Sequence, residues 1–564
     1  MLQSRGLDTV ALPPDRWGSA RENVVSRQGG VPALGLEIAP KRAGGTDRAR
    51  FRSLGCCSVL SAISAMNGLR AYEIPALDGM TSDVDSSSGV RNAGWLVALR
   101  VLHLASGVAF AAIIPRLMGR ADYGRYALLS SLADWFVLAA GLGFVQVFAQ
   151  RAPRLLAGGY VGVVRKLFGR LLAIRFFAST LLAIGYFIIL RLWLADLPQL
   201  AIAALAAAVF VDAMTGVVFA IFIGLGQAAK WGLQEVANRW LAIGLLALGY
   251  RLGGLVGATL ALLPVYALTA SLGLFLARDF VRLSEIRPHW ISSLAHVRFG
   301  AAYFVGTLLL SISQRSGEAL LRAATGDYEQ VAVFGVAYSL YLMFESSLGA
   351  VSFAFAAPIA ALAARADEAA QRAWMDRLLR VFTVGAMVFM LGGVLLGADA
   401  VRLVVGPSYA ESAVVLMPLL AAGVLQVPAV LARLVSITHG RPKDAALAAA
   451  VRLVGMWVLG YGLAAMWGGV GAALAVLAVS LAYAAVFTWR ARRVLRYSMS
   501  GWLRAVLLGL PFLSLIVLRG GLWRNVELAV LACAGYLVLV VVTRQVSFGE
   551  LRALLRAVRG NPGT

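Results

Sequence analysis

Residues 200–226 read LAIAALAAAVFVDAMTGVVFAIFIGLG, and Asp212 is the one charged side chain in this stretch. About 20 apolar residues suffice for a helix to cross the ~30 Å hydrocarbon core of a bilayer. Similar blocks recur from residue 94 onward. Of the 564 residues, 60% are hydrophobic and 14% are charged, and the mean hydropathy is +0.80. A soluble domain is about 45–50% apolar and about 25% charged. The composition therefore excludes an ordinary water-soluble fold and predicts a multispanning membrane protein.

Only helices fit blocks of this length. The bilayer core offers no partners for unpaired backbone groups, and the strands of a membrane barrel alternate over about half as many residues. We therefore predict an all-α polytopic membrane protein with about 14 transmembrane helices. The predicted spans are 94–117, 126–149, 171–192, 200–226, 231–250, 253–277, 299–322, 331–362, 380–401, 412–437, 444–465, 468–489, 501–518 and 525–543.

The distribution of charge predicts the orientation of these spans. The chain carries 51 Lys+Arg against 28 Asp+Glu, a net charge of +23. The basic residues lie between the apolar blocks and not in one patch, so no nucleic-acid partner is expected. Loops after even-numbered spans are basic, and loops after odd-numbered spans are poorer in Lys and Arg, except for the first. The positive-inside rule then places both termini in the cytoplasm. The loop after the twelfth span carries Arg490, Arg492, Arg493, Arg496 and Arg504.

Redox, metal and catalytic chemistry are not expected. Cys56, Cys57 and Cys533 give neither a disulfide framework nor metal-ligand spacing, and the four His residues are scattered. The loops between the predicted spans are short. They leave no room for the external domain in which membrane glycosyltransferases, polymerases and ligases usually hold their chemistry. We therefore expect no cofactor and no enzyme activity.

A turn in the first half of the chain has a counterpart in the second half. RLMGRADYGRYALLSSL (116–132) corresponds to LRAATGDYEQVAVFGVAYSLYLM (321–343). In each copy a predicted helix ends and is followed by a Gly residue and then by an Asp-Tyr pair. An aromatic residue next to Gly then begins the next helix. Gly permits a tight reversal, and the aromatic side chain anchors a helix start at the membrane interface. A repeat six helices apart predicts two similar six-helix halves, which is a common plan among transporters.

The stretches that contain these turns resemble a known family. MGRADYGRYALLSSL (118–132), VFGVAYSLYLMFESSLGAVSFAFAAPIAALAA (333–364) and LVVGPSYAESAVVLMPLLAAG (403–423) are similar to the polysaccharide transporters of the multidrug/oligosaccharidyl-lipid/polysaccharide (MOP) exporter superfamily. These are the Wzx-type flippases of O-antigen and exopolysaccharide synthesis. The resemblance covers most of residues 90–490.

The resemblance implies two six-helix bundles in a V, a central cavity and alternating access. Its implied substrate is an undecaprenyl-pyrophosphate-linked oligosaccharide in the bacterial inner membrane. Membrane lipids, the polymerase and other glycan-assembly proteins are the expected partners. We expect an N-terminal bundle at 91–280, a C-terminal bundle at 281–490, and two further helices with a basic tail at 491–564. Residues 1–90 depart from the family and are expected to form a disordered cytoplasmic tail; a translation start at Met66 or Met80 is the alternative.

Charges inside the predicted spans are the candidates for a binding site. Span seven carries Gln314, Arg315, Glu318 and Arg322 at helical spacings of three and four, which place them on one face. A charge at mid-bilayer costs ~2.5–3.5 kcal/mol, so this face should meet protein or water. In one interpretation Arg315 and Arg322 bind acidic groups of the substrate. In the other, Glu318 neutralises both arginines as a structural knot.

Span one and the inner halves of later spans add further basic groups. Arg100 offers a planar fork that suits phosphate oxygens; alternatively it snorkels to the cytoplasmic surface. His103 is either an interior hydrogen-bonding group or part of a proton-linked step. Arg175 is expected to snorkel. A cationic vestibule that attracts a diphosphate headgroup would be completed by Arg239, Arg433 and Arg452.

Buried carboxylates are the candidates for ion coupling. Asp134, Asp212 and Glu345 lie within predicted spans, where an ionisable group is a functional candidate by default. The alternative is that each pairs with one of the surplus arginines. For Glu235 we expect pairing with Arg239, four residues further along the same helix.

Two other transporter functions fit the same fold. A drug/cation antiporter of the superfamily favours an acidic cavity and twelve spans, whereas the interior here is net basic. A peptidoglycan lipid II flippase has fourteen spans and a cationic cavity, and the sequence does not separate it from a polysaccharide flippase. An enzyme such as a polymerase has no support, since neither a long loop nor paired external carboxylates are present.

Overall fold

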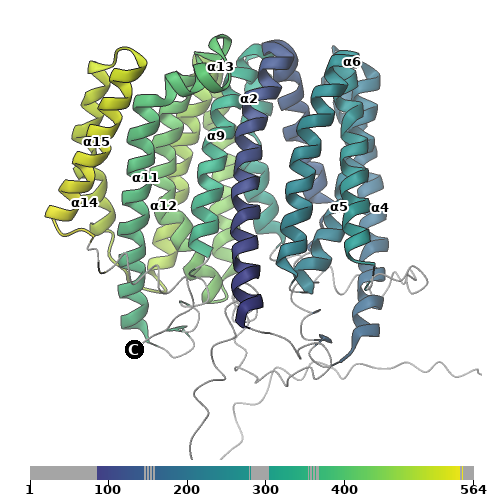
Figure 1. Ribbon diagram of the computed structural model, residues 1–564, viewed down its shortest axis with the longest axis horizontal. Coiled ribbons are helices and arrows are strands. Elements are labelled where there is room, and N and C mark those ends of the chain that lie inside the picture. Colours follow the sequence, from purple (N-terminus) through teal and green to yellow (C-terminus); the bar gives the residue numbers. More distant parts are fainter. Residues whose placement is uncertain are drawn as a thin grey trace, which may run out of the picture. The chain divides into compact units, whose positions relative to one another are not determined.

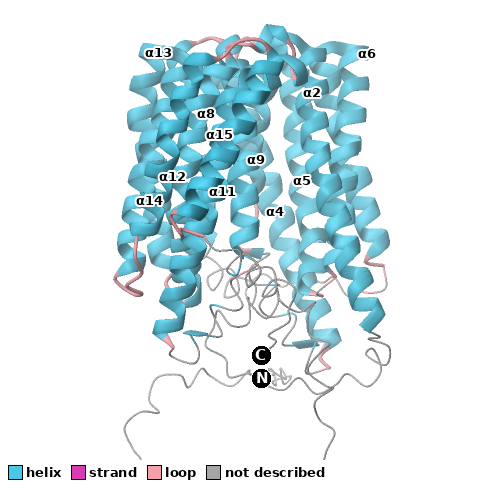
Figure 2. Ribbon diagram, turned by 60° about the vertical axis from the view of Figure 1, so that its left-hand side comes forward, coloured by secondary structure: helices cyan, strands magenta, loops and turns pink. Residues whose placement is uncertain are grey.

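The computed structural model describes residues 86–144, 159–225, 227–278, 304–353 and 367–546, together with a few single positions between these ranges. All of them belong to one compact unit, Arg52–Thr564. Their regular structure is helical throughout, without strands (Figure 2). The predicted tail at 1–90 falls almost wholly outside the described residues, as do Met66, Met80 and the predicted basic C-terminal tail beyond residue 549.

The described helices run roughly parallel or antiparallel to one another (Figure 1). Among the described residues, nine helices are long and apolar enough to cross a membrane. The helices are α2 (Ser86–Ala139), α4 (Val161–Trp193), α5 (Gln199–Gly224), α6 (Ala228–Leu276), a short helix at Phe304–Gln314, α8 (Gly317–Thr325), α9 (Tyr328–Phe353), α11 (Glu368–Val404), η2 (Pro407–Tyr409), α12 (Ser412–Thr438), α13 (Pro442–Arg492), α14 (Ser500–Gly509), η3 (Leu510–Leu518) and α15 (Leu522–Val542).

Three of these helices are each two spans joined by a tight reversal. In α6 the Nζ of Lys230 donates to the carbonyl of Leu276 at 3.2 Å, which joins the two ends of the helix. In α13 Arg490 pairs with Asp444 at 3.5 Å in the same way.

In α2 the rings of Phe110 and Tyr126 lie 6.4 Å apart, whereas a straight helix would separate these positions by about 24 Å. Positive φ values of 71° at Gly119 and 57° at Gly254 allow the reversals in α2 and α6. The reversals divide α2, α6 and α13 where the sequence predicts two spans each. The polytopic all-α fold class is confirmed.

The helices form two groups. α2, α4, α5 and α6 pack against one another and form the N-bundle. The helix at Phe304–Gln314 precedes α8, and α8, α9, α11, α12 and α13 form the C-bundle. The two bundles meet chiefly where α2 contacts α9 and α8, while α14 and α15 pack on α11 at the edge of the C-bundle (Figure 1). The boundary predicted at 280/281 adjoins residues that are not described, and the V-shaped arrangement stays a prediction.

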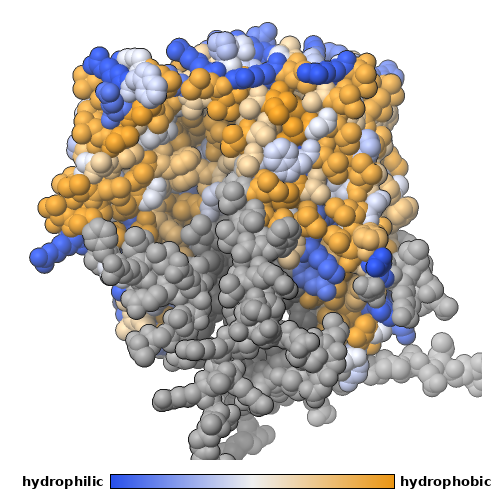
Figure 3. All heavy atoms as spheres, viewed as in Figure 1, coloured by the Kyte–Doolittle hydropathy of each residue, from blue (hydrophilic) through white to orange (hydrophobic). Residues whose placement is uncertain are grey.

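The outer surface of the helices is apolar, as lipid contact requires. Large side chains that face outward include Leu192 and Leu252, each 80% exposed. On the face shown in Figure 3, hydrophobic residues cover most of the helix length, and hydrophilic residues gather at the end that carries the turns of α2, α6 and α13. A surface of this kind is unfavourable in water. The protein is therefore a multi-pass membrane protein.

Span seven differs from its prediction. Instead of one helix over 299–322, the structure has a helix at Phe304–Gln314, a turn at Arg315, and then α8. Side chains from other helices donate hydrogen bonds to the backbone carbonyls at the break. Tyr338 donates to the carbonyl of Gln314 at 2.6 Å, and Trp135 donates to that of Arg315 at 3.2 Å. The four polar residues of span seven therefore do not lie on one continuous helical face.

Candidate functional site

A cavity of about 410 Å³ lies between the two bundles. The N-bundle contributes side chains from α2, α4 and α5, and the C-bundle contributes the helix at Phe304–Gln314 and the turn after it. We call this space the central cavity. Its lining residues are Asp134, Val137, Leu138, Gly141, Arg175, Gly216, Phe304, Thr307, Ser311, Gln314 and Arg315.

Arg315 and Asp134 form an ion pair across the central cavity. Nε of Arg315 lies 3.1 Å from Oδ2 of Asp134, and the two side chains are 42% and 41% exposed. The pair joins the C-bundle to the N-bundle, and the bond from Trp135 to the Arg315 carbonyl lies beside it. Arg315 therefore takes its partner from the other bundle and not from Glu318, as the structural-knot interpretation required. About two-fifths of each side chain stays accessible to a ligand.

Arg175 is the cationic group that sequence reasoning missed. Its side chain is only 6% exposed, and its Nε donates to the carbonyl of Ala213 at 3.0 Å. The expectation that Arg175 snorkels to the surface is wrong. Added Cβ atoms at Gly141 and Gly216 would lie 3.0 and 3.1 Å from the guanidinium nitrogens. Gly141, in the turn after α2, and Gly216, on α5, make room for the guanidinium. These two glycines are the signal that could have identified its position.

Asp212 and Arg239 lie close to this group. Asp212 is partly buried on α5 and is within electrostatic range of Asp134, Arg175 and Arg239. Arg239 is exposed, and no described carboxylate lies within ion-pair distance of it. The predicted pair between Glu235 and Arg239 is wrong.

His103, from span one, is the partner of Glu235. Oε1 of Glu235 lies 3.6 Å from Nδ1 of His103, which is half-buried on α2. The i,i+4 spacing would have allowed Glu235 to pair with Arg239 on the same helix, but its partner is His103 on the neighbouring helix α2. Arg100 lies on α2, and its side chain is outside the described residues.

Arg452 and Glu345 form a closed pair inside the C-bundle. Two bonds of 2.8 and 3.2 Å join the guanidinium to the carboxylate, and the side chains are only 4% and 7% exposed. The guanidinium also lies over the ring of Tyr483. Neither residue lines the central cavity. The placement of Arg452 in a cationic vestibule is therefore wrong, and Glu345 takes the paired alternative considered for the buried carboxylates.

Gln314 connects this buried pair to the cavity. Its Nε2 donates to Oε1 of Glu345 at 2.8 Å, while the same residue lines the cavity wall. Arg433 is half-buried on α12 and lies within electrostatic range of Glu345. The C-bundle thus presents an amide to the central cavity and holds its arginine–glutamate pair behind it.

The remaining two residues of span seven have separate environments. Glu318 is 5% exposed, and its Oε2 has no hydrogen-bond partner among the described residues. Arg322 lies at the end of α8, where it pairs with Asp196 at 3.5 Å and lies 4.0 Å from the ring centre of Tyr328. Tyr328 in turn donates to Asp196 at 2.9 Å. Arg322 therefore belongs to a contact between the bundles outside the cavity lining.

The two repeated turns meet each other at one end of the bundles. A Cβ atom at Gly124 would lie 1.9 Å from the carbonyl oxygen of Tyr328, so α2 and α9 touch backbone to backbone. Arg120 pairs with Glu329 at 3.7 Å and with Glu411 at 3.0 Å. We call this set of contacts, with Arg322 and its partners, the turn-end contact. It holds the bundles together at the end where Gly119 lies. The repeat in the sequence gave no sign that its two copies touch.

Among the described residues, no group of three or more His, Cys, Asp or Glu side chains is placed to hold a metal ion.

Comparisons with known proteins identify the fold. No family model and no curated protein matches the chain. An inward-facing multidrug resistance MATE family transporter of the MOP superfamily matches with a TM-score of 0.57 and 17% identity, over 71% of this chain and 94% of that chain. The lipid II flippase MurJ in an inward closed conformation matches with a TM-score of 0.59 and 13% identity, over 80% and 98%. The chain therefore has the fold of the MOP superfamily transporters.

Proposed function

We propose that the protein is a flippase for undecaprenyl-pyrophosphate-linked oligosaccharide units. It moves them from the cytoplasmic to the periplasmic leaflet of the bacterial inner membrane, for O-antigen, capsule or exopolysaccharide synthesis. The observation that carries this proposal is the pair of guanidinium groups, Arg175 and Arg315, in a cavity between two bundles. Among the described lining residues Asp134 is the one carboxylate, so these residues carry two positive charges and one negative charge, a net +1.

A net positive cavity suits a diphosphate and not a cation. Arginine presents donors in a fork that matches phosphate oxygens, and charge interactions are stronger between protein walls, where the effective dielectric constant is lower than in bulk water. The half-exposed Arg315 is the group we assign to first contact with the headgroup, since buried Arg175 already donates to a backbone carbonyl. The same charge disfavours the drug/cation antiporter, whose substrate would be repelled.

Alternating access supplies the movement. The turn-end contact shuts one end of the space between the bundles in this conformation, and transport requires that it open while the opposite end closes. With both termini in the cytoplasm, as the basic loops predict, the shut end is the periplasmic one. Asp134 and Asp212 stay our candidates for ion coupling. Glu345 is dropped, because both of its carboxylate oxygens accept bonds from the buried Arg452. No enzyme activity is proposed.

Export of surface glycan by variants tests the proposal. Arg315→Glu and Arg175→Glu should abolish export while the protein remains in the membrane. Arg524→Glu is the matched control, because it reverses an exposed arginine on α15 that contacts neither cavity nor bundle interface. Immunoblots of the membrane fraction establish equal amounts. Full export by both cavity variants at wild-type membrane levels would reject the proposal.

A second candidate function is the peptidoglycan lipid II flippase. The likeness to MurJ in fold favours it, and its substrate carries the same diphosphate. Rescue of a strain depleted of its lipid II flippase separates the two, because a polysaccharide flippase is not expected to restore growth there.

A further inference from the structure

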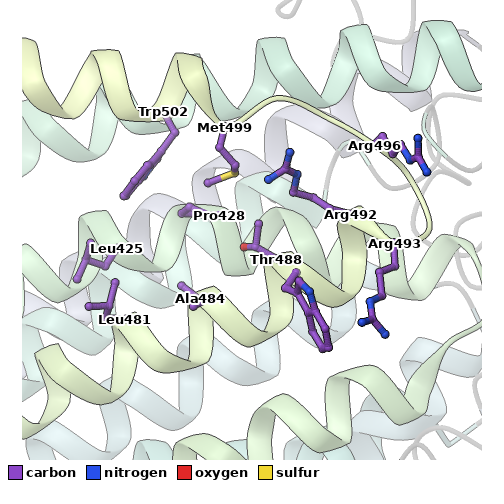
Figure 4. A pocket seen from close by; sticks show the side chains of 12 residues that line it. Leu425, Pro428, Leu481, Ala484, Thr488, Arg492, Arg493, Arg496, Met499 and Trp502 are labelled. Atoms are coloured by element: carbon purple, nitrogen blue, oxygen red, sulfur yellow. The ribbon is translucent and has the colours of Figure 1, made fainter.

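A second cavity lies on the outer side of the C-bundle, where α12, α13 and the connection to α14 meet. Its volume is about 650 Å³, within the range of about 300–1,000 Å³ that is usual for ligand sites. We call it the seam pocket (Figure 4). None of its lining residues lines the central cavity. They are Leu425, Pro428, Leu481, Ala484, Ala485, Thr488, Trp489, Arg492, Arg493, Arg496, Met499 and Trp502.

The seam pocket is apolar at one end and cationic at the other. Figure 4 shows Leu425, Leu481 and Trp502 at one end, and Arg493 and Arg496 at the other. The arginines beside the pocket, Arg492, Arg493 and Arg496, are all exposed. This division of polarity matches an amphiphile that lies along α13.

The cationic end holds its charges without a close anionic partner. Among the described residues, no carboxylate lies within ion-pair distance of the three arginines. Asp376 is within electrostatic range of Arg492, but its carboxylate accepts a bond of 2.7 Å from the N–H of Ser498. Arg493 lies 3.7 Å from the ring centre of Trp489, which holds its guanidinium beside the pocket. Three such cations in one place attract a polyvalent or membrane-bound anion.

The apolar end opens toward the lipid. Leu481 and Trp489 are 54% and 52% exposed on the outer face of α13. Trp502 closes the pocket from α14 and reaches the carbonyl of Val424 at 3.5 Å. At the cationic end Trp489 packs against Arg493, and tryptophan is typical of the membrane–water interface. The arginines of this loop indicate its cytoplasmic side. The cationic end thus lies at headgroup level and the apolar end at chain level.

We propose that the seam pocket binds an anionic glycerophospholipid of the cytoplasmic leaflet. Its phosphate contacts Arg492, Arg493 and Arg496, and one acyl chain runs along Leu425 and Leu481 toward Trp502. The bound lipid fills the joint between the C-bundle and the α14–α15 pair, which packs mainly on α11. This site is separate from the transport cavity and does not depend on the identity of the transported substrate.

Two other phosphate compounds, inorganic phosphate and a polyprenyl phosphate, would use the cationic and apolar ends of the pocket differently from a glycerophospholipid. Inorganic phosphate would use the arginines and leave the apolar end unused. A polyprenyl phosphate would use both ends, but it lacks a second acyl chain and a glycerol backbone. The shared element is the phosphate, so competition among the three ligands decides the source.

Lipid binding to the purified full-length protein tests the proposal, by native mass spectrometry or with a fluorescent lipid. We expect phosphatidylglycerol to bind and phosphatidylcholine not to compete. The triple variant Arg492→Gln, Arg493→Gln, Arg496→Gln should bind phosphatidylglycerol roughly 100- to 150-fold more weakly, since each basic group near the membrane adds about 1 kcal/mol, a factor of about five in affinity. The matched control is Arg402→Gln, Arg519→Gln, Arg524→Gln, which removes the same charge elsewhere and should bind normally.

A second variant tests the apolar half of the pocket. It also keeps the proposal testable if the triple variant does not fold. Ala485→Trp fills the exposed wall of the pocket and keeps every arginine, so phosphatidylglycerol binding should fall without a change in the thermal unfolding temperature. Equal binding by the triple variant and its control overturns the proposal. So does equal competition by phosphatidylcholine, or displacement of the lipid by inorganic phosphate or by polyprenyl phosphate at lower concentrations than phosphatidylglycerol itself.

Discussion

Replacing Arg315 by Gln should separate transport from folding. Arg315 and Asp134 are each about two-fifths exposed, and an ion pair in such a setting contributes only ~0.2–1 kcal/mol to stability. The variant should therefore unfold close to the wild-type temperature. A guanidinium–phosphate bond is worth about 1.5–3 kcal/mol because it involves charged groups. Its loss should weaken binding of a polyprenyl-diphosphate saccharide by roughly 10- to 150-fold.

Arg452→Gln is the matched comparison, because it makes the same chemical change at the closed pair. Arg452 and Glu345 are almost fully buried, and removing one partner of a buried pair costs about 3–5 kcal/mol. This variant should unfold at a clearly lower temperature and accumulate poorly in the membrane. The double variant Arg452→Gln, Glu345→Gln should recover part of the loss, since it leaves no uncompensated charge.

Thermal unfolding in detergent and ligand binding to the same preparations provide the two readouts. The reasoning is refuted if Arg315→Gln destabilises the protein as much as Arg452→Gln does. It is also refuted if Arg315→Gln leaves the affinity for the diphosphate lipid unchanged, because the exposed half of its guanidinium would then have no ligand.

Three further substitutions probe the packing around the cavity. Gly124→Leu should prevent the turn-end contact, because even a Cβ atom would lie 1.9 Å from the carbonyl oxygen of Tyr328; distances between spin labels at that end should then increase, and unchanged distances contradict the contact. Gly216→Leu should displace the guanidinium of Arg175, whose nitrogen lies 3.1 Å from the added Cβ, and weaken diphosphate binding, whereas wild-type affinity would mean that Arg175 does not contribute. Glu318→Gln should not lower the unfolding temperature, because the buried Oε2 has no hydrogen-bond partner among the described residues; a lower temperature would reveal a partner.

Hydropathy alone predicted the fold class, because each span must be apolar for the length of the bilayer. Its predicted boundaries, 117/126 and 250/253, also fell at or within a few residues of the reversals at Gly119 and Gly254, where glycine takes a positive φ. What it did not predict was the interruption of span seven at Arg315. The carbonyls at that break accept hydrogen bonds from Trp135 and Tyr338, which lie on other helices. The sequence of a single span cannot indicate these contacts.

The partners of the interior charges were the least predictable part of the site. Spacing along a helix suggested Glu318 for Arg315, whereas the partner is Asp134 in the other bundle. Arg175 was assigned to the surface because it lies near a span end. The space that accepts its guanidinium is made by Gly141, in the turn after α2, and Gly216, on α5. Sequence spacing describes one helix at a time, and the electrostatics of this cavity arise between helices.

Translocation of a fluorescent lipid-linked oligosaccharide in proteoliposomes tests the proposed role of the cavity arginines. We expect the wild-type protein to move the lipid between leaflets, and we expect Arg175→Gln, Arg315→Gln to lose this movement while Arg402→Gln, Arg524→Gln retains it. Equal translocation by the cavity variant, or none by the wild-type protein when its unfolding temperature shows it to be intact, would contradict the proposal.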